Sequence, residues 1–531
     1  MLNRRRFLIS TSAAASWLAT PAALRAASAL STWQTNPFTL GVASGAPTSD
    51  GFVLWTRLAP DPLCADAMTP GGLCAGDVPL QFEIASDDAM RNIVQSGSAQ
   101  AEAQFAHSVH QQVRGLKPNR PYWYRFRSGD AYSAIGRAIT LPAASAPLEK
   151  LHLGFVSCAN YEHGYFSAYR HLAEEQPDLV LFLGDYIYEY VDKVSTDLVR
   201  THSDGVEATD LRTYRNRYAQ YRLDNDLQQV HAIAPSLVTW DDHEVVNDYG
   251  DLLSATYGAA PTFPAPAEFK LRRAAAYQAF YEHMPLTPRR LPHDAQLRIY
   301  DQFSLGNLAQ IFMTDTRQHR SRAPCYGPPN NVPGRVIAPD ECPELLDESR
   351  SMYGVPQEQW LYQNMAKSTA RWNIIGQSVL MAQVRRRSPT GKPLYWTDDW
   401  NGFPASRRHL LQHVHDSKVS NPIVIGGDAH AYFANDLKVN FDDETSPVVA
   451  SEFVGTSVSS KAGFDFSDVL ADNPHMRYFN RDYRGYVSMQ LGPKQLHARY
   501  QAISDPRDRH AGVRTLQEFV VEDGKPGVQP A

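Results

Sequence analysis

The sequence predicts an α/β protein preceded by an all-β segment, and three observations lead to this fold class. The chain has 531 residues and 43% hydrophobic content, which is enough for two or three domains with sizeable cores. Residues 36–143 contain short alternating runs between turn residues, as the strands of a β-sandwich do. From residue 151 onward, apolar runs alternate with helical stretches, which is typical of an α/β domain.

The all-β segment is expected over residues 35–145. Its runs include FTLGVASG, GFVLWTRL, VPLQFEIAS and YWYRFRSG. The motif GLKP at residues 115–118, followed by Tyr122 and Tyr124, resembles the fibronectin type III pattern, in which a tyrosine packs near a strand corner. We therefore expect a fibronectin-III-like β-sandwich without chemistry of its own, joined to the rest of the chain by a linker at residues 143–150.

The larger domain is expected over residues 150–515, followed by a C-terminal tail at residues 516–531. Its central strands are predicted from six apolar runs, at residues 151–157, 179–183, 236–240, 308–313, 372–376 and 422–426. Continuous apolar runs of this length indicate strands that are buried on both faces of a sheet. Ligands of such sheets bind beyond the carboxyl ends of the strands, so the residues that follow each run are candidates for a site.

Residues 1–29 resemble a twin-arginine signal peptide. The motif NRRRFL at residues 3–8 has paired arginines before Phe-Leu, and a weakly apolar stretch leads to a small-residue cleavage site, ASA, at residues 27–29. We expect the twin-arginine machinery to export the folded chain, so the mature protein would be periplasmic or secreted. No other apolar run of about 18 residues occurs, so no transmembrane anchor is expected in the mature chain.

The charge of the chain argues against nucleic-acid partners. The formal net charge is −6, and cleavage of residues 1–29 would remove four arginines and no acidic residue. Because nucleic-acid binding depends on basic side chains that neutralise phosphates, we expect no nucleic-acid-binding module.

The five cysteines divide into two pairs and one residue left over. Cys64 and Cys74 lie in one Gly/Pro-rich segment, and Cys325 and Cys342 flank another loop. In an oxidising compartment, both pairs are expected to form disulfides that close these loops. Cys158 directly follows an apolar, strand-like run, and an odd cysteine in an exported protein favours a ligand or a nucleophile over a buried free thiol.

Four of the predicted strands are followed by side chains that can bind metals. In chain order these are Cys158, Asp185, Tyr188, Asp241, Asp242, His243, Glu244, Asp428 and His430. Carboxylate and phenolate oxygens suit hard cations, whereas a thiolate beside them indicates a softer or redox-capable ion such as iron. Two ions about 3.5 to 4 Å apart can orient a water and neutralise phosphoryl oxygens, so phosphoryl transfer suits this set best.

The order of these motifs resembles that of the calcineurin-type metallophosphatases, whose signature includes GD, GNH[DE] and GHxH. Here DHE at residues 242–244 stands in place of Asn-His-Glu, and GDAH at residues 427–430 stands in place of Gly-His-x-His. These departures, together with Cys158 and GDYIYEY, are similar to the pattern of the PhoD-like alkaline phosphatases. That resemblance covers residues 35 to 500 and also includes WDDHEVVND, YQAFYEHMP, TDTRQHR, DDWNGFPASR, GGDAHAYF and LGVASGAPTSDGFVLWTRLAP.

The resemblance implies a calcineurin-like metallophosphatase domain, in which helices flank a β-sandwich core. It implies a secreted alkaline phosphatase and phosphodiesterase that hydrolyses small phosphoester substrates with a metal-activated oxygen nucleophile. The implied cofactors are one ferric ion (Fe3+) and two calcium ions (Ca2+). Carried onto this sequence, Cys158 and Tyr188 would be iron ligands, and Asp185 would bridge iron and calcium.

The remaining roles follow from the same resemblance. Asp242, Asp428 and His430 would complete the metal shell, and His243 would be the catalytic residue that faces the phosphate. Asp241 is the alternative to Asp242, because side chains alternate between the two faces at the end of a strand.

Two other functions are consistent with parts of the pattern. A cysteine hydrolase would use Cys158 as nucleophile and a histidine such as His243 as base, but it would leave the aspartates without a task. The other alternative is a non-catalytic exported protein that binds metal or phosphate. Arg317, Arg407 and Arg484 also lie in family-like segments, and for them we expect structural ion pairs rather than phosphate contacts.

Overall fold

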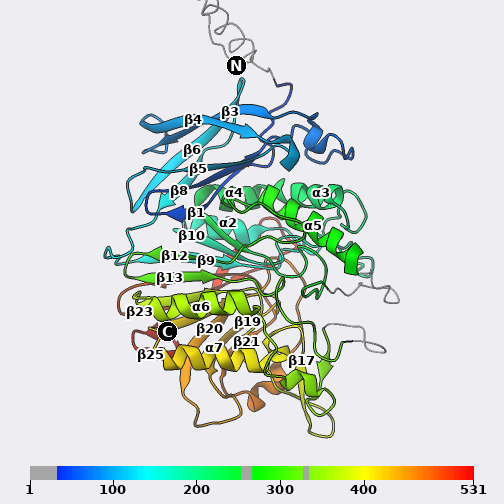
Figure 1. Cartoon of the computed structure of the whole chain (residues 1–531), viewed down its shortest axis with the longest axis vertical. Helices are drawn as coiled ribbons and strands as arrows, with labels where there is room; N and C mark the ends of the chain where they lie inside the picture. The colour runs from blue at the N-terminus through cyan, green and yellow to red at the C-terminus, as the bar shows by residue number, and fades with distance from the viewer. Residues whose placement is uncertain (1–32, 253–265, 327–333) are drawn as a thin grey trace, which may run out of the picture.

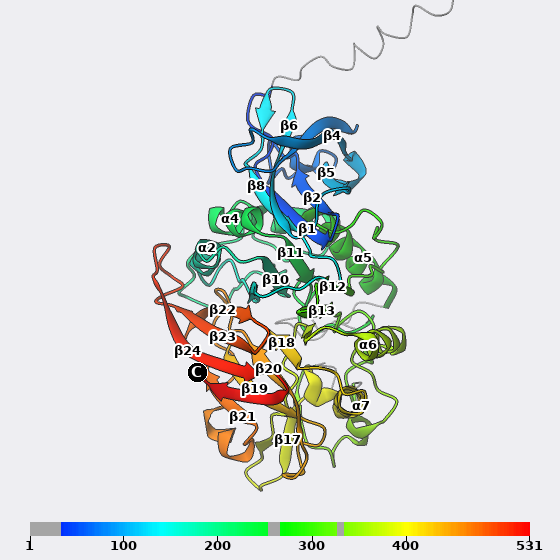
Figure 2. The ribbon, with the colours of Figure 1, turned by 90° about the vertical axis from the view of Figure 1, so that its left-hand side faces the viewer.

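The computed structural model describes residues 33–252, 266–326 and 334–531, so the predicted signal peptide at residues 1–29 lies outside the described residues. Two large sheets face each other in the centre of the molecule (Figures 1 and 2). The ten-stranded sheet contains, in spatial order, β25 (Lys525–Pro530), β24 (Val513–Glu522), β23 (Gln495–Ile503), β22 (Arg484–Leu491), β9 (Leu151–Val156), β10 (Leu179–Leu183), β11 (Ser236–Thr239), β1 (Val42–Thr48), β2 (Gly51–Arg57) and β5 (Ser108–Val113). The seven-stranded sheet contains β12 (Asp301–Leu305), β13 (Ala309–Met313), β15 (Trp372–Gly376), β18 (Pro422–Gly426), β20 (Val448–Val454), β19 (Tyr432–Lys438) and β21 (Met476–Asn480).

The main core lies between these two sheets. Apolar side chains of both sheets meet there, among them Leu181 of β10, Ile311 of β13 and Ile374 of β15, all of which are fully buried. The six apolar runs of the sequence are confirmed as strands β9, β10, β11, β13, β15 and β18. Both sheets are buried on two faces at their centres, which explains why these strands are continuously apolar.

Helices cover the outer faces of the sheets. On one side lie α2 (Ser167–Glu174), α3 (Leu211–Arg222), α4 (Asn225–Ile233) and α5 (Pro266–His283), and on the other side lie α6 (Val355–Lys367) and α7 (Pro404–Asp416). In Figure 1, α3, α4 and α5 lie between the N-terminal strands and the central sheets, and Figure 2 shows α6 and α7 at the side of the seven-stranded sheet. Asp224 caps α4 by accepting hydrogen bonds from the backbone N–H groups of Asp226 and Leu227.

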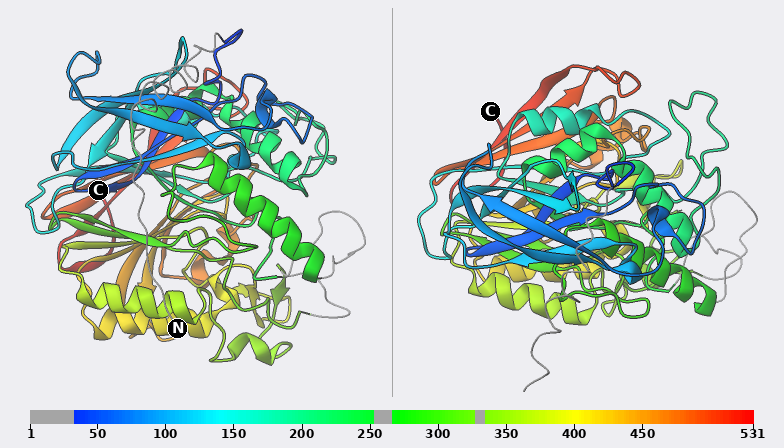
Figure 3. Two further views of the ribbon diagram at one scale, coloured as in Figure 1. Left: turned by 45° about the horizontal axis from the view of Figure 1, so that its top comes forward. Right: turned by 90° about the horizontal axis from the view of Figure 1, so that it is seen from above.

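The N-terminal strands form a second layer above these helices, as the right-hand view of Figure 3 shows. A five-stranded sheet of β4 (Ile93–Ala101), β3 (Val78–Ala85), β6 (Arg120–Ser128), β7 (Ala131–Tyr132) and β8 (Gly136–Thr140) packs on β1, β2 and β5. The hydroxyl of Tyr122 hydrogen-bonds the backbone of Lys117 at 3.0 and 3.3 Å, next to the GLKP motif. Strand β1 also pairs with β11 in parallel, through Gly45 and Ser236, so the N-terminal strands extend the ten-stranded sheet.

The expected C-terminal tail at residues 516–531 is corrected, because these residues belong to β24 and β25. Phe519, Val521 and Val528 are buried against the core between the sheets. The spacing of Phe519 and Val521 is that of a strand with one buried face. Between the two strands lies a turn at Asp523 and Gly524, where glycine takes the left-handed conformation with φ of 76°.

A small three-stranded sheet lies at the edge of the molecule, with β17 (Pro393–Trp396) between β14 (Val336–Ile337) and β16 (Arg386–Arg387). Of the two predicted disulfides, Cys325–Cys342 is confirmed. The Cys64–Cys74 disulfide is corrected, because both residues are free thiols and the sulfur of Cys64 lies 3.6 Å from the hydroxyl of Thr69 instead. Within the described part of the chain, no helix combines the length and the apolar character needed to cross a membrane.

Candidate active site

The predicted metal ligands come together where the parallel strands end. Strands β9, β10 and β11 run parallel in one sheet, and β13, β15, β18 and β20 run parallel in the other. Their ends bring together four groups of side chains whose ligand atoms lie within 4.8 Å of one another in each group. The groups are Cys158, Asp185 and His430; Asp185, Asp242 and His243; Asp185, Asp241, Asp242 and Asp428; and Asp242, Asp248 and Asp398. Asp185 belongs to three of the four groups, so it is the centre of the cluster.

The backbone is strained at several of these residues. Cys158, Asp185, Asp428 and His430 have φ between 50° and 61°, a left-handed region that costs free energy for residues other than glycine. At Asp185 the left-handed conformation is stabilised by Glu244. The carboxylate of Glu244 accepts hydrogen bonds from the backbone N–H of Asp185 at 3.2 Å and from neighbouring N–H groups. The surrounding structure therefore fixes the direction of the ligand side chains before any ion binds.

Tyr188, which is predicted from the sequence to be an iron ligand, lies next to the group formed by Cys158, Asp185 and His430. Its hydroxyl lies 2.9 Å from Oδ2 of Asp185 and 3.1 Å from Nε2 of His430, and Ser460 donates to it at 2.8 Å. Nδ1 of His430 lies 2.8 Å from the carbonyl oxygen of Lys461, which fixes the ring and leaves Nε2 for a ligand. Burial lowers the pKa of His430 to about 3, so the ring is neutral and can bind a cation.

His243 has a different environment. Its Nδ1 lies 2.6 Å from Oε2 of Glu189, so Nε2 is the nitrogen that remains for a ligand. Burial alone would lower the pKa of His243, but the negative charges of Glu189, Asp242 and Asp185 outweigh burial and raise the pKa well above its usual value. A protonated His243 can donate a hydrogen bond to an anion in the cavity.

The charge of the cluster fits bound cations. Burial, together with neighbouring carboxylates, raises the pKa of Asp185, Asp248 and Asp428 well above the usual range. Oδ1 of Asp185 and Oδ2 of Asp241 are buried and have no hydrogen-bond partner among the described residues. Buried carboxylates with unsatisfied oxygens are expected to be paired or to bind metal, so the residues present fit the cations that the sequence predicts.

A cavity of about 210 Å³ opens onto this cluster. Asp185, Tyr188, Asp242, His243 and His430 all line it, together with Asp428. Asp241, the alternative to Asp242, is absent from the lining because Oδ1 of Asp241 binds Nε of Arg317 at 2.6 Å. Of the two neighbouring aspartates, Asp242 is therefore the one that lines the cavity, while Asp241 still belongs to one of the groups of potential ligand atoms.

Comparisons with known proteins agree with this site. A family model described as PhoD-like phosphatase matches residues 153–500, and a model described as the N-terminal domain of PhoD-like phosphatases matches residues 24–142. The chain belongs to the PhoD-like phosphatase family. Alkaline phosphatase D of Bacillus subtilis (strain 168) is 41% identical over 503 residues, which make up 93% of this chain and 82% of that relative.

A solved structure of PhoD is also similar to this PhoD-like phosphatase. The two share 40% sequence identity and superpose with a TM-score of 0.86, over 94% of this chain and 93% of that chain. The sheet-rich α/β fold is thus that of a PhoD structure, and the enzyme is a phosphoric ester hydrolase.

Three residues of this phosphatase site were assigned no role from the sequence. Asp248 and Asp398 share a group with Asp242, and Glu189 holds His243. Each lies in a segment that the sequence had already singled out, namely WDDHEVVND, DDWNGFPASR and GDYIYEY. The sequence therefore indicated the right segments, but it did not show which of the several acidic residues in each segment faces the cluster.

The three arginines of the family-like segments do not line the cavity of the phosphatase. Arg317 is fully buried and pairs with Asp241 at 2.6 Å and Asp398 at 2.7 Å, so the expected structural ion pair is confirmed there. Arg407 donates to the carbonyl of Met381 and to two neutral side chains. Arg484 donates to Ser457 and to backbone carbonyls. Neither Arg407 nor Arg484 forms an ion pair with a carboxylate in the described part of the chain, so the expectation is wrong for both.

Proposed function

We propose that this PhoD-like phosphatase is an exported, metal-dependent phosphoesterase that hydrolyses small phosphomonoesters and phosphodiesters. Its catalytic domain would be the metallophosphatase unit at residues 150–515, with calcineurin-like paired sheets, behind a fibronectin-III-like domain at residues 35–145. The observation that carries the proposal is the sharing of Asp185 among three groups of ligand atoms. A carboxylate in that position can hold two cations close together, which is the arrangement that phosphoryl transfer uses.

The donor atoms support two kinds of cation. Cys158, Tyr188 and His430 offer sulfur, phenolate oxygen and imidazole nitrogen next to Asp185, a mixed set that favours a ferric ion. Two other groups consist of aspartates alone and offer only carboxylate oxygens, which favours calcium; they are Asp185, Asp241, Asp242 and Asp428, and Asp242, Asp248 and Asp398. We assign the two calcium ions that the family resemblance implies to these two groups. When bound, such cations supply positive charge to the phosphoryl oxygens and make a nucleophilic water more acidic.

The chain itself supplies orientation and a proton donor. The strained turns at Asp185 and Asp428 hold their carboxylates in place without rearrangement during the reaction. Nε2–H of His243 donates a hydrogen bond to a phosphoryl oxygen, and Glu189 keeps the ring charged and oriented as negative charge develops on that oxygen.

The geometry gives no support to the cysteine hydrolase alternative. Cys158 does not line the cavity, and its sulfur lies 3.2 Å from the hydroxyl of Ser157. Burial and the nearby charges of Asp185 and Asp428 raise the pKa of the thiol well above its usual value, which disfavours a free thiolate nucleophile. A cation next to Cys158 would reverse this effect and favour the thiolate as a ligand.

The test compares wild-type protein, purified by its own export route, with Asp185→Asn. We expect the wild type to hydrolyse p-nitrophenyl phosphate at alkaline pH and to contain iron and calcium, with a visible absorption band if phenolate and thiolate bind ferric iron. Asp185→Asn should lose activity by about a hundredfold or more, because a cation-holding carboxylate becomes neutral. It should lose bound metal as well. Asp301→Asn removes a carboxylate that pairs with Arg290 and does not line the cavity, and it should keep both activity and metal.

Two outcomes would contradict the proposal in different ways. Near-normal turnover by Asp185→Asn, or full activity of the chelated, metal-free wild type, would show that the cluster is not the catalytic centre. An active enzyme without iron by elemental analysis would overturn only the iron assignment and leave a calcium-dependent phosphoesterase.

A further inference from the structure

Three consecutive arginines, residues 385–387, have different surroundings. Arg385 pairs with Asp442, and Arg387 pairs with Asp472 at 2.6 Å. Arg386, between them, forms no ion pair with any described carboxylate. Arg386 and Arg387 are both in β16, and successive side chains of a strand point to opposite faces, so Arg386 is turned away from the face that carries the ion pair of Arg387.

Aromatic rings hold the guanidinium of Arg386. Its Cζ atom lies 4.7 Å from the ring centroid of Phe464 and 4.7 Å from that of Phe466. A guanidinium in cation–π contact with aromatic rings can still donate its N–H groups to an acceptor. Nη2 of Arg386 is buried and has no hydrogen-bond partner among the described residues. A buried, unpartnered donor calls for an explanation, and a ligand is one.

Arg386 lines the same cavity as the metal-binding cluster. Trp396 of β17 and Phe464 line it too, with ring centroids 5.4 Å apart, and Phe464 is 50% exposed although it is apolar. The titratable side chains of the cluster are mostly carboxylates, whereas this aromatic wall carries a cation. The cavity therefore also presents a cation to an anionic group, beside apolar side chains.

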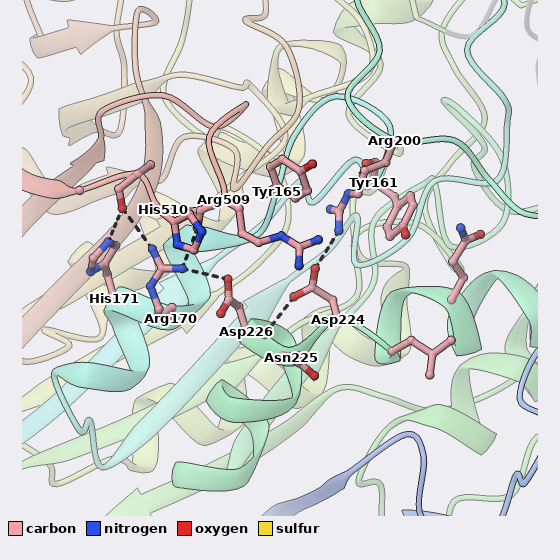
Figure 4. A pocket seen from close by; sticks show the side chains of 14 residues that line it. Tyr161, Tyr165, Arg170, His171, Arg200, Asp224, Asn225, Asp226, Arg509 and His510 are labelled. Carbon is pink, nitrogen blue, oxygen red and sulfur yellow. Dashed lines mark hydrogen bonds and ion pairs between the residues drawn. The ribbon is translucent and has the colours of Figure 1, made fainter.

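A second cavity, of about 620 Å³, is lined by arginines that provide a comparison with Arg386 (Figure 4). There Arg200 binds Asp224 at 2.7 Å and Arg170 binds Asp226 at 3.3 Å. Arg509 stacks on the ring of Tyr165 but is exposed to solvent. In contrast to Arg386, none of these arginines has a buried nitrogen without a hydrogen-bond partner.

We infer that Arg386, held over the rings of Phe464 and Phe466, binds a second phosphate of the substrate, beside the phosphoryl group that is hydrolysed. The inference rests on the proposed phosphoesterase function and adds the substrate class: phosphoesters whose alcohol part carries a further phosphate. A guanidinium matches phosphate geometry with two parallel hydrogen bonds. Trp396 supplies an apolar surface for the part of the substrate that joins the two phosphates.

The test uses two substrates that differ only in a second anion. Phenyl phosphate has none, and 4-(phosphonomethyl)phenyl phosphate carries a phosphonate whose C–P bond a phosphoesterase does not hydrolyse. We expect the wild type to have a higher kcat/KM for the phosphonate-bearing substrate, by about tenfold, because a charge-assisted hydrogen-bond pair contributes that much. Arg386→Gln should bring the ratio of the two kcat/KM values close to one, mainly by raising KM for the phosphonate-bearing substrate.

Arg387→Gln is the matched control, because it removes the neighbouring charge and an exposed ion pair but no group of the cavity. It should keep the wild-type ratio. Arg386→Lys should keep part of the preference, since a lysine retains the charge but cannot form the two-pronged contact. Thermal melting and metal content should be the same in all variants, which separates a lost contact from a damaged fold.

The possible results differ clearly. An unchanged ratio in Arg386→Gln, or an equal loss on both substrates, would overturn the second-phosphate site. A wild-type enzyme without preference for the phosphonate-bearing substrate would overturn it too. Hydrolysis of neither substrate by metal-loaded wild type would overturn the proposed function and this site with it.

Discussion

At the scale of single residues, the contact between Glu189 and His243 allows an effect on catalysis to be distinguished from an effect on metal binding. Glu189 accepts from the backbone N–H of Asn247 at 2.9 Å and contacts Nδ1 of His243 at 2.6 Å. It is nearly inaccessible to solvent, with 0% exposure. Glu189 belongs to none of the four groups of ligand atoms, so its effect on the reaction should pass through His243.

We therefore expect His243→Ala to keep its metal and to lose about a hundredfold in kcat/KM, or 2.7 kcal/mol of transition-state stabilisation. Glu189→Gln should lose about tenfold, because glutamine still accepts a hydrogen bond but no longer stabilises the charged ring. Steady-state kinetics with metal analysis measure both effects. Glu207→Gln, which removes an ion pair with Arg272 outside the cavity, should behave like the wild type. Loss of metal in His243→Ala would instead make this histidine a ligand, since it shares a group with Asp185 and Asp242.

The residues of the site could be predicted where chemistry and strand ends coincide. Cys158, Asp185 and His430 follow apolar runs within a few residues, so their convergence follows from the parallel sheets. Asp398 is different, because it reaches the site through Arg317, 81 residues earlier in the chain, and no local pattern shows such a contact. The same limit applies to Cys64, whose pairing depends on how its loop folds rather than on spacing.

At the scale of secondary structure, Glu175 joins a helix to a sheet. It is the C-cap of α2, and its carboxylate accepts hydrogen bonds from Tyr486 at 2.7 Å and Ser488 at 2.6 Å, both in β22. Arg499 of β23 donates to it at 3.0 Å, and His152 of β9 lies 3.3 Å away. Burial alone would raise the pKa of Glu175, but these hydrogen bonds and the charge of Arg499 outweigh burial and lower it to about 2.

This shift predicts how the stability depends on pH. The folded state binds a proton at Glu175 less readily than the unfolded chain, whose pKa is 4.5, so the contribution to stability is complete above pH 4.5. It decreases as the pH falls towards 2. Because the side chain is 18% exposed and partly screened, we expect Glu175→Gln to lower the free energy of unfolding by about 2 kcal/mol at pH 7.

Denaturant titrations of wild type and Glu175→Gln between pH 7 and pH 3 measure this effect, and the difference between them should shrink in the acid range. Glu174→Gln changes the adjacent residue, whose side chain is 55% exposed, and should stay within about 0.5 kcal/mol of the wild type at every pH. A constant difference for Glu175→Gln over the whole range would contradict the assigned shift.

The positions of the central strands along the sequence could be predicted, but the pairing of strands within the sheets could not. Apolar runs located six central strands, because burial on two faces leaves a continuous apolar sequence. The pairing of β1 with β11 joins segments nearly two hundred residues apart and depends on one register position. The hairpin of β24 and β25 did carry a local signal, an Asp-Gly turn, which the expectation of a tail overlooked.

At the scale of the whole molecule, the compartment in which the protein works remains a prediction from residues 1–29. The disulfide Cys325–Cys342 favours an oxidising compartment. Because the export receptor reads the arginine pair, the double change Arg4→Lys and Arg5→Lys should keep the protein in the cytoplasm. Fractionation of cells followed by a phosphatase assay measures the distribution. Arg25→Lys, in the same signal segment but away from the pair, should be exported normally, and normal export of the double variant would rule out the twin-arginine route.

The order of strands in the ten-stranded sheet also determines when the sheet can be completed during biosynthesis. Strand β9, which carries Cys158 at its end, has β10 on one side and β22 on the other, and β22 emerges from the ribosome more than three hundred residues later. Until then the edge of β9 lacks its partner, and pairing over such a sequence distance is slow. Asp428 and His430, which follow β18, are also made late. A nascent chain therefore lacks the complete cluster until its last part has been made, so cations that need all of these ligands would bind only late in synthesis or after it.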